Sequence, residues 1–218
     1  MFGQFGWHAI TLLLIAARWT VLLSVLAFAL GGLAGFAVAL VRTSRSPVSR
    51  TITAAYIEIV QGTPVLILLF LAYFGVALIG IDVPPLLAAS IALTVFSSAY
   101  LGEIWRGCID AIPRAQWEAS ESLGMTRWQQ LRHIILPQAF RISLPPTVGF
   151  LVQLIKNTSV ASLISLVELT REGQLIANAN FRPLPTYVAV ALIYFVLCFP
   201  LSKYSQSLER RLHVGRQS

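Results

Sequence analysis

Apolar residues occur in long runs along this chain, separated by short polar or proline-containing segments. The longest uncharged run covers 23 residues, 19–41, and it stops at Arg42. A helix needs about 20 mostly apolar residues to cross the hydrocarbon core of a bilayer. The pattern therefore predicts a membrane span at 19–41. The shorter apolar stretch before it, 5–17, is expected to form an interfacial helix, with one continuous, longer first helix as the alternative.

Four further spans follow from the same pattern. The apolar block that begins near Thr51 is interrupted around Gly62 and Pro64, which weaken a helix, so the second span is placed after the break. A polar stretch, 168–182, is expected to form a short external helix between the last two spans. The chain is thus predicted to be a single all-α membrane domain of residues 1–218 with five spans. Spans two to five are expected at 64–80, 86–103, 142–162 and 185–202.

The basic residues are distributed unevenly between the two ends of these spans. Twelve of the 16 Lys and Arg residues follow spans one, three and five, whereas the other four lie elsewhere. Loops on the cytoplasmic side of membrane proteins carry an excess of Lys and Arg. We therefore expect the N-terminus outside and the C-terminus in the cytoplasm. The twelve residues are Arg42, Arg45, Arg50, Arg106, Arg114, Arg127, Arg132, Arg141, Lys203, Arg210, Arg211 and Arg216.

Composition agrees with a membrane location and excludes several function classes. Apolar residues make up 56% of the chain and charged residues 11%, against about 25% charged in a soluble domain. The net charge of +7 does not indicate nucleic-acid binding, because the basic residues lie in loops beside apolar segments. The two cysteines, Cys108 and Cys198, predict neither a disulfide framework nor a metal site.

Two kinds of catalysis are disfavoured by the positions of a few residues. His8, His133 and His213 all lie outside the predicted spans, so no Ser-His pair is expected within the membrane. A phosphate-binding loop needs Gly-Lys-Ser/Thr, and neither Lys156 nor Lys203 follows a glycine. If nucleotide drives this protein, another chain must bind it, and this chain should have a cytoplasmic surface that contacts that partner.

The loop between spans three and four, 113–137, has the features of such a surface. Pro113 suits the first turn of a helix that continues to Leu123, and Gly124 is placed to end it in a left-handed conformation. Thr126 then begins a second helix with a capping-box spacing to Gln129, and Pro137 is expected to end it. Taken from the residues alone, an amphipathic loop lying on the membrane surface is the alternative.

The same loop resembles a known signature, the EAA loop of ATP-binding-cassette importer permeases. The family pattern is E-A-A, three residues, G, nine residues, I-x-L-P, and this chain differs from it only in having serine as the third residue. The resemblance implies that these residues contact the ATPase subunit. They are Glu118, Ala119, Ser120, Gly124, Ile134, Leu136 and Pro137.

Shorter matches extend the resemblance over most of the chain. The segment 61–64 is similar to the family's R-G-T-P, and 156–159 to its K-D-T-S, in the branch that imports polar amino acids. Gln61 and Asn157 depart from these patterns, and the departures bear on substrate rather than on coupling. The resemblance implies a dimer of ATPase subunits, a second permease that is a copy or a relative, and an external binding protein, periplasmic or lipid-anchored.

Several polar residues within or beside the spans are candidates for the substrate pathway. Lys156 is the most informative, because an ionisable group deep in a span needs a cavity or a partner. It can attract a substrate carboxylate or pair with a carboxylate of the second permease. Glu103 and Arg106, three residues apart, are expected to form a structural ion pair. The pathway candidates are Gln61, Thr63, Ser98, Tyr100, Lys156, Asn157 and Thr158.

The sequence therefore predicts the permease subunit of an importer for polar amino acids in a bacterial inner membrane, in contact with lipid and without a covalent reaction of its own. No cofactor or metal is expected in this chain, since ATP and Mg²⁺ would be bound by the partner. The alternative is a secondary transporter or channel assembled from five-span subunits. That class needs ion-handling carboxylates in its spans, and only Glu58 and Glu103 come close.

Overall fold

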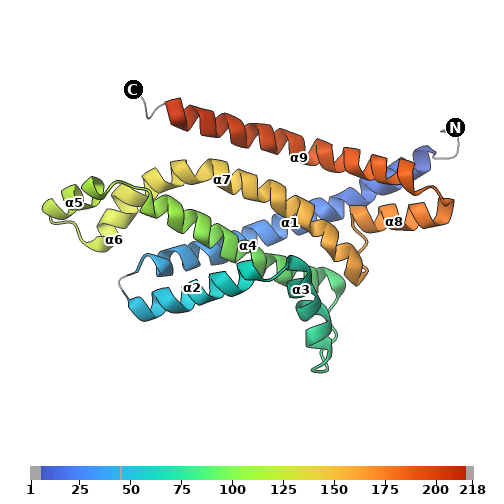
Figure 1. Cartoon of the computed structure of the whole chain (residues 1–218), viewed down its shortest axis with the longest axis horizontal. Coiled ribbons are helices and arrows are strands. Elements are labelled where there is room, and N and C mark those ends of the chain that lie inside the picture. The colour runs from blue at the N-terminus through green and yellow to red at the C-terminus, as the bar shows by residue number, and fades with distance from the viewer. Residues whose placement is uncertain (1–5, 45, 215–218) are drawn as a thin grey trace.

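The computed structural model describes residues 6–44 and 46–214, and every regular element in these two ranges is helical. In chain order the elements are α1 (Trp7–Arg42), α2 (Pro47–Gly62), α3 (Val65–Phe70), the π-helical turn η1 (Leu71–Gly75), α4 (Pro85–Asp110), α5 (Arg114–Ser122), α6 (Arg127–Gln130), the π-helical turn η2 (Leu131–Ile135), α7 (Leu136–Asn157), the 3₁₀ helix η3 (Thr158–Ile164), α8 (Leu169–Asn180) and α9 (Pro183–Val214). The long helices α1, α4, α7 and α9 run roughly along the long axis of the molecule (Figure 1).

The first helix is continuous, so the expectation of a separate interfacial helix at 5–17 is wrong for residues 7–17. Phe5 lies outside the described residues. Ala16, Ala17 and Arg18 are good helix formers without a breaker between them, so nothing in the sequence ends the helix before Trp19. The 36 residues of α1 span about 54 Å at 1.5 Å per residue. This is well above the thickness of a bilayer core, about 30 Å.

The second apolar block forms a bent pair of helices rather than one straight span at 64–80. α2 ends at Gly62, Thr63 is extended, and α3 with η1 continues at an angle of 101° to α2. Pro64 directly precedes α3, where its missing N–H group costs nothing. The helix then gives way to a turn at 78–80.

By length and composition, four helical segments of the described chain can each cross a membrane. They are α1, α4, the continuous stretch 127–164 and α9, and the bent pair of α2 with α3 and η1 makes a fifth if it counts as one broken span. α4 and α9 both extend past the predicted spans, to Asp110 and Val214. The segment expected as a short helix at 168–182 is helical as α8.

Pro137 does not end the second helix of the loop, contrary to the prediction. α6, η2 and α7 follow one another without a break, and Pro137 is within the first two residues of α7. The π-helical turn η2 changes the hydrogen-bond register just before the proline. The helix can therefore continue through Pro137 although proline has no N–H group to donate. The loop is therefore joined rigidly to the helix that contains the predicted fourth span.

Small and aromatic residues make the core between α1, α4 and α7. Gly31 and Gly35 of α1 lie directly against α4. Phe96 and Tyr100 of α4 stack on Phe150 of α7, with ring centres 6.0 and 5.6 Å from that of Phe150. Close approach over small residues is how membrane helices gain packing contacts.

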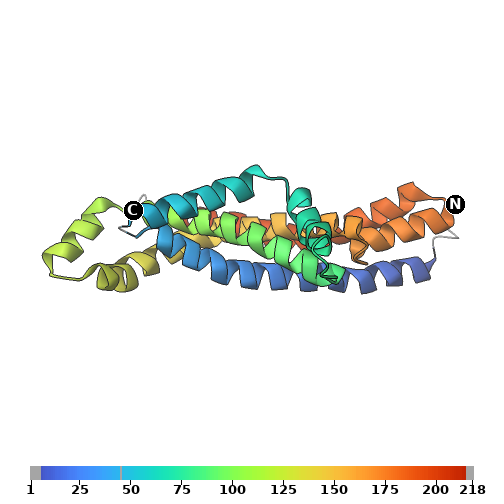
Figure 2. The same ribbon diagram turned by 90° about the horizontal axis from the view of Figure 1, so that it is seen from below.

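The two ends of the molecule carry different segments. The C-terminal end of α9, the start of α2, and α5 with α6 lie at one end, whereas the start of α1 and α8 lie at the other (Figure 1). Figure 2 shows the same separation from below. The loops that hold most of the basic residues are thus gathered at one end. Arg45 and Arg216 belong to these loops but lie outside the described residues.

Candidate functional site

The loop 113–137 contains a left-handed glycine turn between its two helices, as predicted. Gly124 has a φ of +70°. Its N–H group donates to the carbonyl of Glu121 at 2.9 Å, and the N–H group of Met125 donates to the carbonyl of Ser120 at 3.2 Å. These two bonds form a Schellman motif, which satisfies the last carbonyl groups of α5. The turn therefore fixes the angle at which α6 leaves α5.

Side-chain bonds hold the second half of the turn. The hydroxyl and N–H groups of Thr126 form the predicted capping box with Gln129. The side-chain amide of Gln130 donates to the carbonyl of Met125 at 3.3 Å. The Arg127 guanidinium carbon lies 3.8 Å from the centre of the Trp117 ring, a cation–π contact that links the two helices. The loop is consequently a rigid element.

The base of the loop is buried and its tip is exposed. Ile135 is fully buried against Ile109 and Ile112, and the half-buried Ile134 and Leu136 pack on the same cluster. At the tip, Leu123 is 80% exposed and Trp128 57% exposed. An apolar tip on a rigid arm is a surface suited to a protein partner.

The other residues of the signature are divided between surface and interior. Glu118, Ala119 and Pro137 are exposed, so each can reach a partner. Ser120 is buried, and its hydroxyl donates to the carbonyl of Trp117 at 2.8 Å. Ser120 therefore supports α5 from within and does not offer the contact surface expected of it.

A pocket of about 430 Å³ lies between α2, α4 and α7 and contains part of the predicted pathway. Gln61 and Tyr100 line it together with Glu103, Arg106 and, from α7, Pro146. The side-chain amide of Gln61 also donates to the carbonyl of Ala99 at 3.4 Å, which holds α2 on α4. This pocket is the point where the predicted pathway residues of α2 and α4 meet.

The ion pair predicted between Glu103 and Arg106 is present and has a third member. Arg106 Nε donates to Glu103 Oε2 at 2.9 Å, and Arg106 Nη1 donates to Asp110 Oδ2 at 2.5 Å. The spacing of three and four residues on one helix allows both contacts. Asp110 was missed because it follows the predicted end of the span, whereas α4 continues to it.

Three of the pathway candidates, Thr63, Ser98 and Thr158, have hydroxyl groups that are bonded within the chain. Those of Thr63 and Thr158 donate to the carbonyls of Ile59 and Ile155, each at 2.7 Å. Ser98 is buried and donates to the carbonyl of Val95 at 2.8 Å. Hydroxyls in helices commonly bond back to the preceding turn in this way. These three residues therefore have local structural partners and do not line the pocket of Gln61 and Tyr100.

Lys156 and Asn157 lie apart from that pocket, at the end of α7. Lys156 is exposed and Asn157 is half-buried. Phe150, which stacks on Tyr100, lies six residues before Lys156, or about 9 Å along the helix. The structure thus brings only Gln61 and Tyr100 together in the pocket, whereas Lys156, Asn157 and Thr158 lie further along the chain at the end of α7 and the start of η3.

A buried carboxylate that the sequence did not single out connects three helices near α8. Glu168 is fully buried. Its carboxylate accepts bonds from the Thr20 hydroxyl of α1 at 3.3 Å, the Tyr194 hydroxyl of α9 at 3.1 Å and the N–H groups of Thr170 and Arg171 at 3.0 and 2.9 Å. The side chain caps α8 while it holds α1 and α9 in place. A helix-capping position before Leu169 was the only available signal in the sequence.

Replacing Glu168 should destabilise the protein and change its response to pH. Burial raises the pKa of the Glu168 carboxyl above its ordinary value of 4.5, against the four hydrogen bonds that favour the carboxylate. A raised pKa means that the folded state holds the proton more tightly than the unfolded state. The contribution to stability is therefore greatest below about pH 4.5 and falls as pH rises through the folded-state pKa.

Thermal unfolding in detergent between pH 4.5 and 8 tests this role of Glu168. Glu168→Ala leaves buried donors without an acceptor and should lower the free energy of unfolding by about 2–3 kcal/mol. Glu168→Gln removes the titration, so the melting temperature of wild type minus that of this variant should decrease with rising pH. A difference that stays constant over this range contradicts the assignment. Glu172→Gln, on the same helix, is the control for charge.

Within residues 6–44 and 46–214, no three His, Cys, Asp or Glu side chains are grouped as metal ligands would be.

The architecture is that of a helical membrane permease, with four or five apolar spans and a rigid helical arm at one end. Residues 28–214 match the family described as binding-protein-dependent transport system inner membrane component. The chain belongs to this family.

Similar proteins include permeases of amino-acid transporters. The chain is 37% identical over 193 residues to the probable amino-acid ABC transporter permease protein YckA of Bacillus subtilis, covering 88% of this chain and 85% of that one. It is 36% identical over 210 residues to the glutamine transport system permease protein GlnP of Escherichia coli, covering 95% and 96%.

A solved structure has the same fold. It is titled as the crystal structure of an amino acid ABC transporter with histidines, and it is 35% identical in sequence with a TM-score of 0.87 over 92% of this chain and 94% of that one. The MetNI methionine ABC transporter in an inward-facing conformation, 18% identical, has a TM-score of 0.73 over 93% and 99%. The second likeness concerns the fold alone.

Proposed function

We propose that this chain is the membrane-spanning permease subunit of an ATP-driven importer of polar amino acids in a bacterial inner membrane. The observation that carries the proposal is the rigid arm α5–α6, with its exposed apolar tip, in a chain that resembles amino-acid permeases along almost its whole length. The chain has no Gly-Lys-Ser/Thr sequence of its own. A separate ATPase dimer therefore supplies the nucleotide site, with ATP and Mg²⁺, and this chain holds no cofactor.

The arm α5–α6 is the contact with the ATPase. Leu123 and Trp128 give it an apolar tip, and Glu118 adds a charge beside that tip. Because η2 joins the arm to α7 without a break, a displacement of the arm moves α7 as a rigid body. The Phe150 ring of α7 stacks on Tyr100 in the pocket of Gln61. The movement thus reaches the candidate pathway.

The arm lies on the cytoplasmic side and the N-terminus outside. The ends of α1 and α4 and the start of α2, which carry Arg42, Arg106 and Arg50, lie at the same end as the arm (Figure 1), as the positive-inside rule requires for a cytoplasmic face. An external binding protein then delivers substrate at the end that contains α8. A second permease, identical or related, completes the pathway, and Lys156 faces either the substrate carboxylate or that subunit.

Purification and uptake measurements test this function. A tagged chain, isolated from its native host in mild detergent, should carry an ATPase with it. In proteoliposomes, labelled glutamine, glutamate, histidine, arginine or cystine should enter only when the binding protein is outside and ATP is enclosed inside, on the side of the arm. Uptake driven by an ion gradient without ATP would instead establish the secondary transporter. Arg210→Gln, outside both the arm and the pocket, serves as the control variant.

A further inference from the structure

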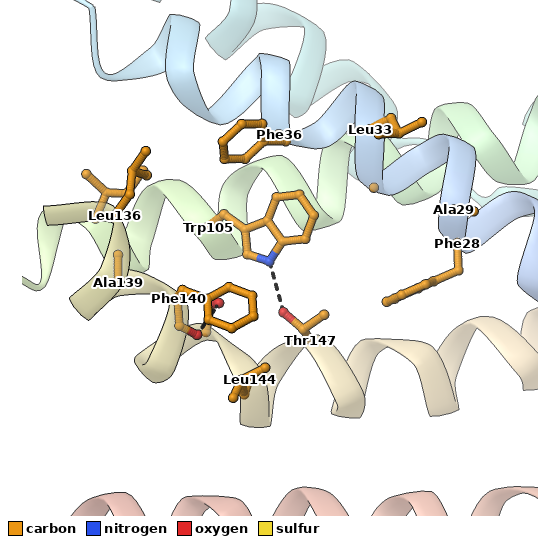
Figure 3. Close-up of a pocket in the computed structure, with 13 residues that line it drawn as sticks. Phe28, Ala29, Leu33, Phe36, Trp105, Leu136, Ala139, Phe140, Leu144 and Thr147 are labelled. Carbon is orange, nitrogen blue, oxygen red and sulfur yellow. Dashed lines mark hydrogen bonds between the residues drawn. The ribbon is translucent and has the colours of Figure 1, made fainter. Parts of the chain in front are cut away.

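An apolar groove and a basic pocket lie next to each other at the arm end of the molecule. The groove has a volume of about 540 Å³ and lies between α1, α4 and α7. Figure 3 shows its side chains around one space, with Trp105 at the centre. Its principal lining residues are Phe28, Phe36, Trp105, Leu136, Phe140 and Leu144.

The groove offers hydrocarbon surface and no free polar group. Its two hydroxyls are already bonded: Thr147 accepts a hydrogen bond from the Trp105 ring N–H group at 2.9 Å, and Ser143 donates to the carbonyl of Phe140 at 2.9 Å. The dashed line in Figure 3 marks the first of these bonds. Leu33 and Phe140, which also line the groove, are 74% and 64% exposed. An occupant must therefore be apolar where it lies in the groove.

The basic pocket begins where the groove ends. Ile109 lines both, and Thr43 of the pocket, the residue directly after α1, follows Phe36 of the groove by seven residues. Seven residues are two helical turns, which puts both side chains on one face about 10 Å apart along the axis. The pocket has a volume of about 450 Å³ and is lined by four arginines and one aspartate, with Trp117 of the arm.

Arg42 and Arg50 are the arginines of the pocket that bear on its charge most directly. Arg106 forms ion pairs with Glu103 and Asp110. Arg42 donates from Nη1 to the backbone carbonyl of Arg50 at 3.1 Å, while its Nε atom and the hydroxyl of Ser44 are buried without a hydrogen-bond partner. Two buried donors beside an excess of positive charge form a site for an anion.

We propose that the groove and the basic pocket together bind one anionic phospholipid. An acyl chain lies in the groove beside Trp105, and the phosphate headgroup lies in the pocket against Arg42 and Arg50. An apolar helix of a second permease would fill the groove but would not neutralise the positive charge of the pocket. An anionic amphiphile has both an apolar chain for the groove and a negative charge for the pocket. Basic pockets between membrane helices on the cytoplasmic side recognise lipids of this kind. The choice of the cytoplasmic leaflet rests on the proposed orientation.

The site would link lipid composition to the arm. Trp117 and Arg127 of the arm line the same pocket as Arg42. A phosphate held by Arg42 of α1 and Arg50 of α2 lies in the pocket that Trp117 and Arg127 of the arm also line, so it restrains the arm relative to the bundle. Neutral lipids lack the headgroup charge and would occupy the groove alone.

Native mass spectrometry of the purified complex, titrated with phosphatidylglycerol or phosphatidylcholine, tests the site. Wild type should retain phosphatidylglycerol preferentially. Arg50→Gln, an exposed position without folding risk, should weaken its retention about fivefold, and Arg42→Gln with Arg50→Gln about 25-fold. Ala29→Phe should fill the groove and reduce retention of both lipids. The controls are Arg210→Gln with Arg211→Gln for charge and Leu30→Phe for bulk.

Three results would overturn the proposal. Equal losses in the Arg210 and Arg211 control would mean general electrostatic attraction. Competition by glycerol phosphate, with Ala29→Phe binding normally, would mean a site for free phosphate. Loss of the second permease in Ala29→Phe with lipid retention unchanged would make the groove a subunit interface. None of these readouts requires transport, so a failure of the lipid site is distinct from a failure of the proposed function.

Discussion

Gly124→Val should strongly reduce transport while the protein still accumulates in the membrane. Gly124 has a φ of +70°, and a Cβ atom added there would meet no other atom within 4 Å. The cost of valine is therefore in the backbone alone, about 1–2 kcal/mol for a left-handed residue and more for a β-branched one. The backbone can relieve this strain by abandoning the Schellman turn, and α6 then leaves α5 at a different angle. We expect ATP-driven uptake to fall at least about tenfold.

Gly124→Asn is the matched control, because asparagine tolerates the left-handed conformation better than other residues. It should keep most of the uptake and most of the ATPase bound to the purified complex. Equal loss in both variants would mean that the side chain, and not the backbone angle, disturbs the contact. Normal uptake by Gly124→Val would mean that coupling does not depend on the arm.

Glu118→Lys tests the surface of the arm instead of its angle. Glu118 is exposed on α5, so the change should leave the fold intact and reverse a charge at the partner contact. Together the two variants separate the direction of the arm from its chemistry.

The arm could be predicted from the sequence because its determinants are local. The loop is defined by a glycine that needs a positive φ and by a capping box between Thr126 and Gln129. Both lie within a few residues of each other, and the structure has both at the predicted spacing. Pro137 was misjudged because its effect depends on the π-helical turn before it. That turn is a property of the whole stretch from α6 to α7 rather than of the proline.

The continuous spans and the break near Gly62 and Pro64 were predictable from the sequence, whereas the size of the bend and the tertiary contacts were not. The residues at the break predict that the helix is interrupted, but they do not give the 101° angle between α2 and α3. The sequence showed Glu168 only as the first residue of the predicted short external helix at 168–182. Its role depends on Thr20, 148 residues away in the chain, which a local pattern cannot reveal. Ser98 looked like a pathway residue for the same reason, although Tyr56 and Val95 bind its hydroxyl.

Gly31→Val should prevent α1 and α4 from packing and cause the largest loss of stability among the variants considered. A Cβ atom at Gly31 would lie 2.4 Å from the Ser97 Cβ and 3.1 Å from the Thr94 carbonyl oxygen. Neither is the end of a flexible side chain, so the two helices must move apart. Overpacking of this kind costs about 1–3 kcal/mol for one extra group, and valine adds three carbon atoms. We expect little folded protein in the membrane fraction.

Gly31→Ala and Gly32→Ala give a graded comparison at neighbouring positions of one helix. A Cβ atom at Gly32 would be 3.6 Å from Trp105, an ordinary contact, and alanine favours a helix over glycine by about 1 kcal/mol. Gly32→Ala should therefore leave the melting temperature in detergent unchanged or raised, whereas Gly31→Ala should lower it. Because the two substitutions are chemically identical, a shared response would indicate a general effect on α1. Opposite responses would locate the stability in the contact between Gly31 and Ser97, the point at which the backbones of α1 and α4 approach each other.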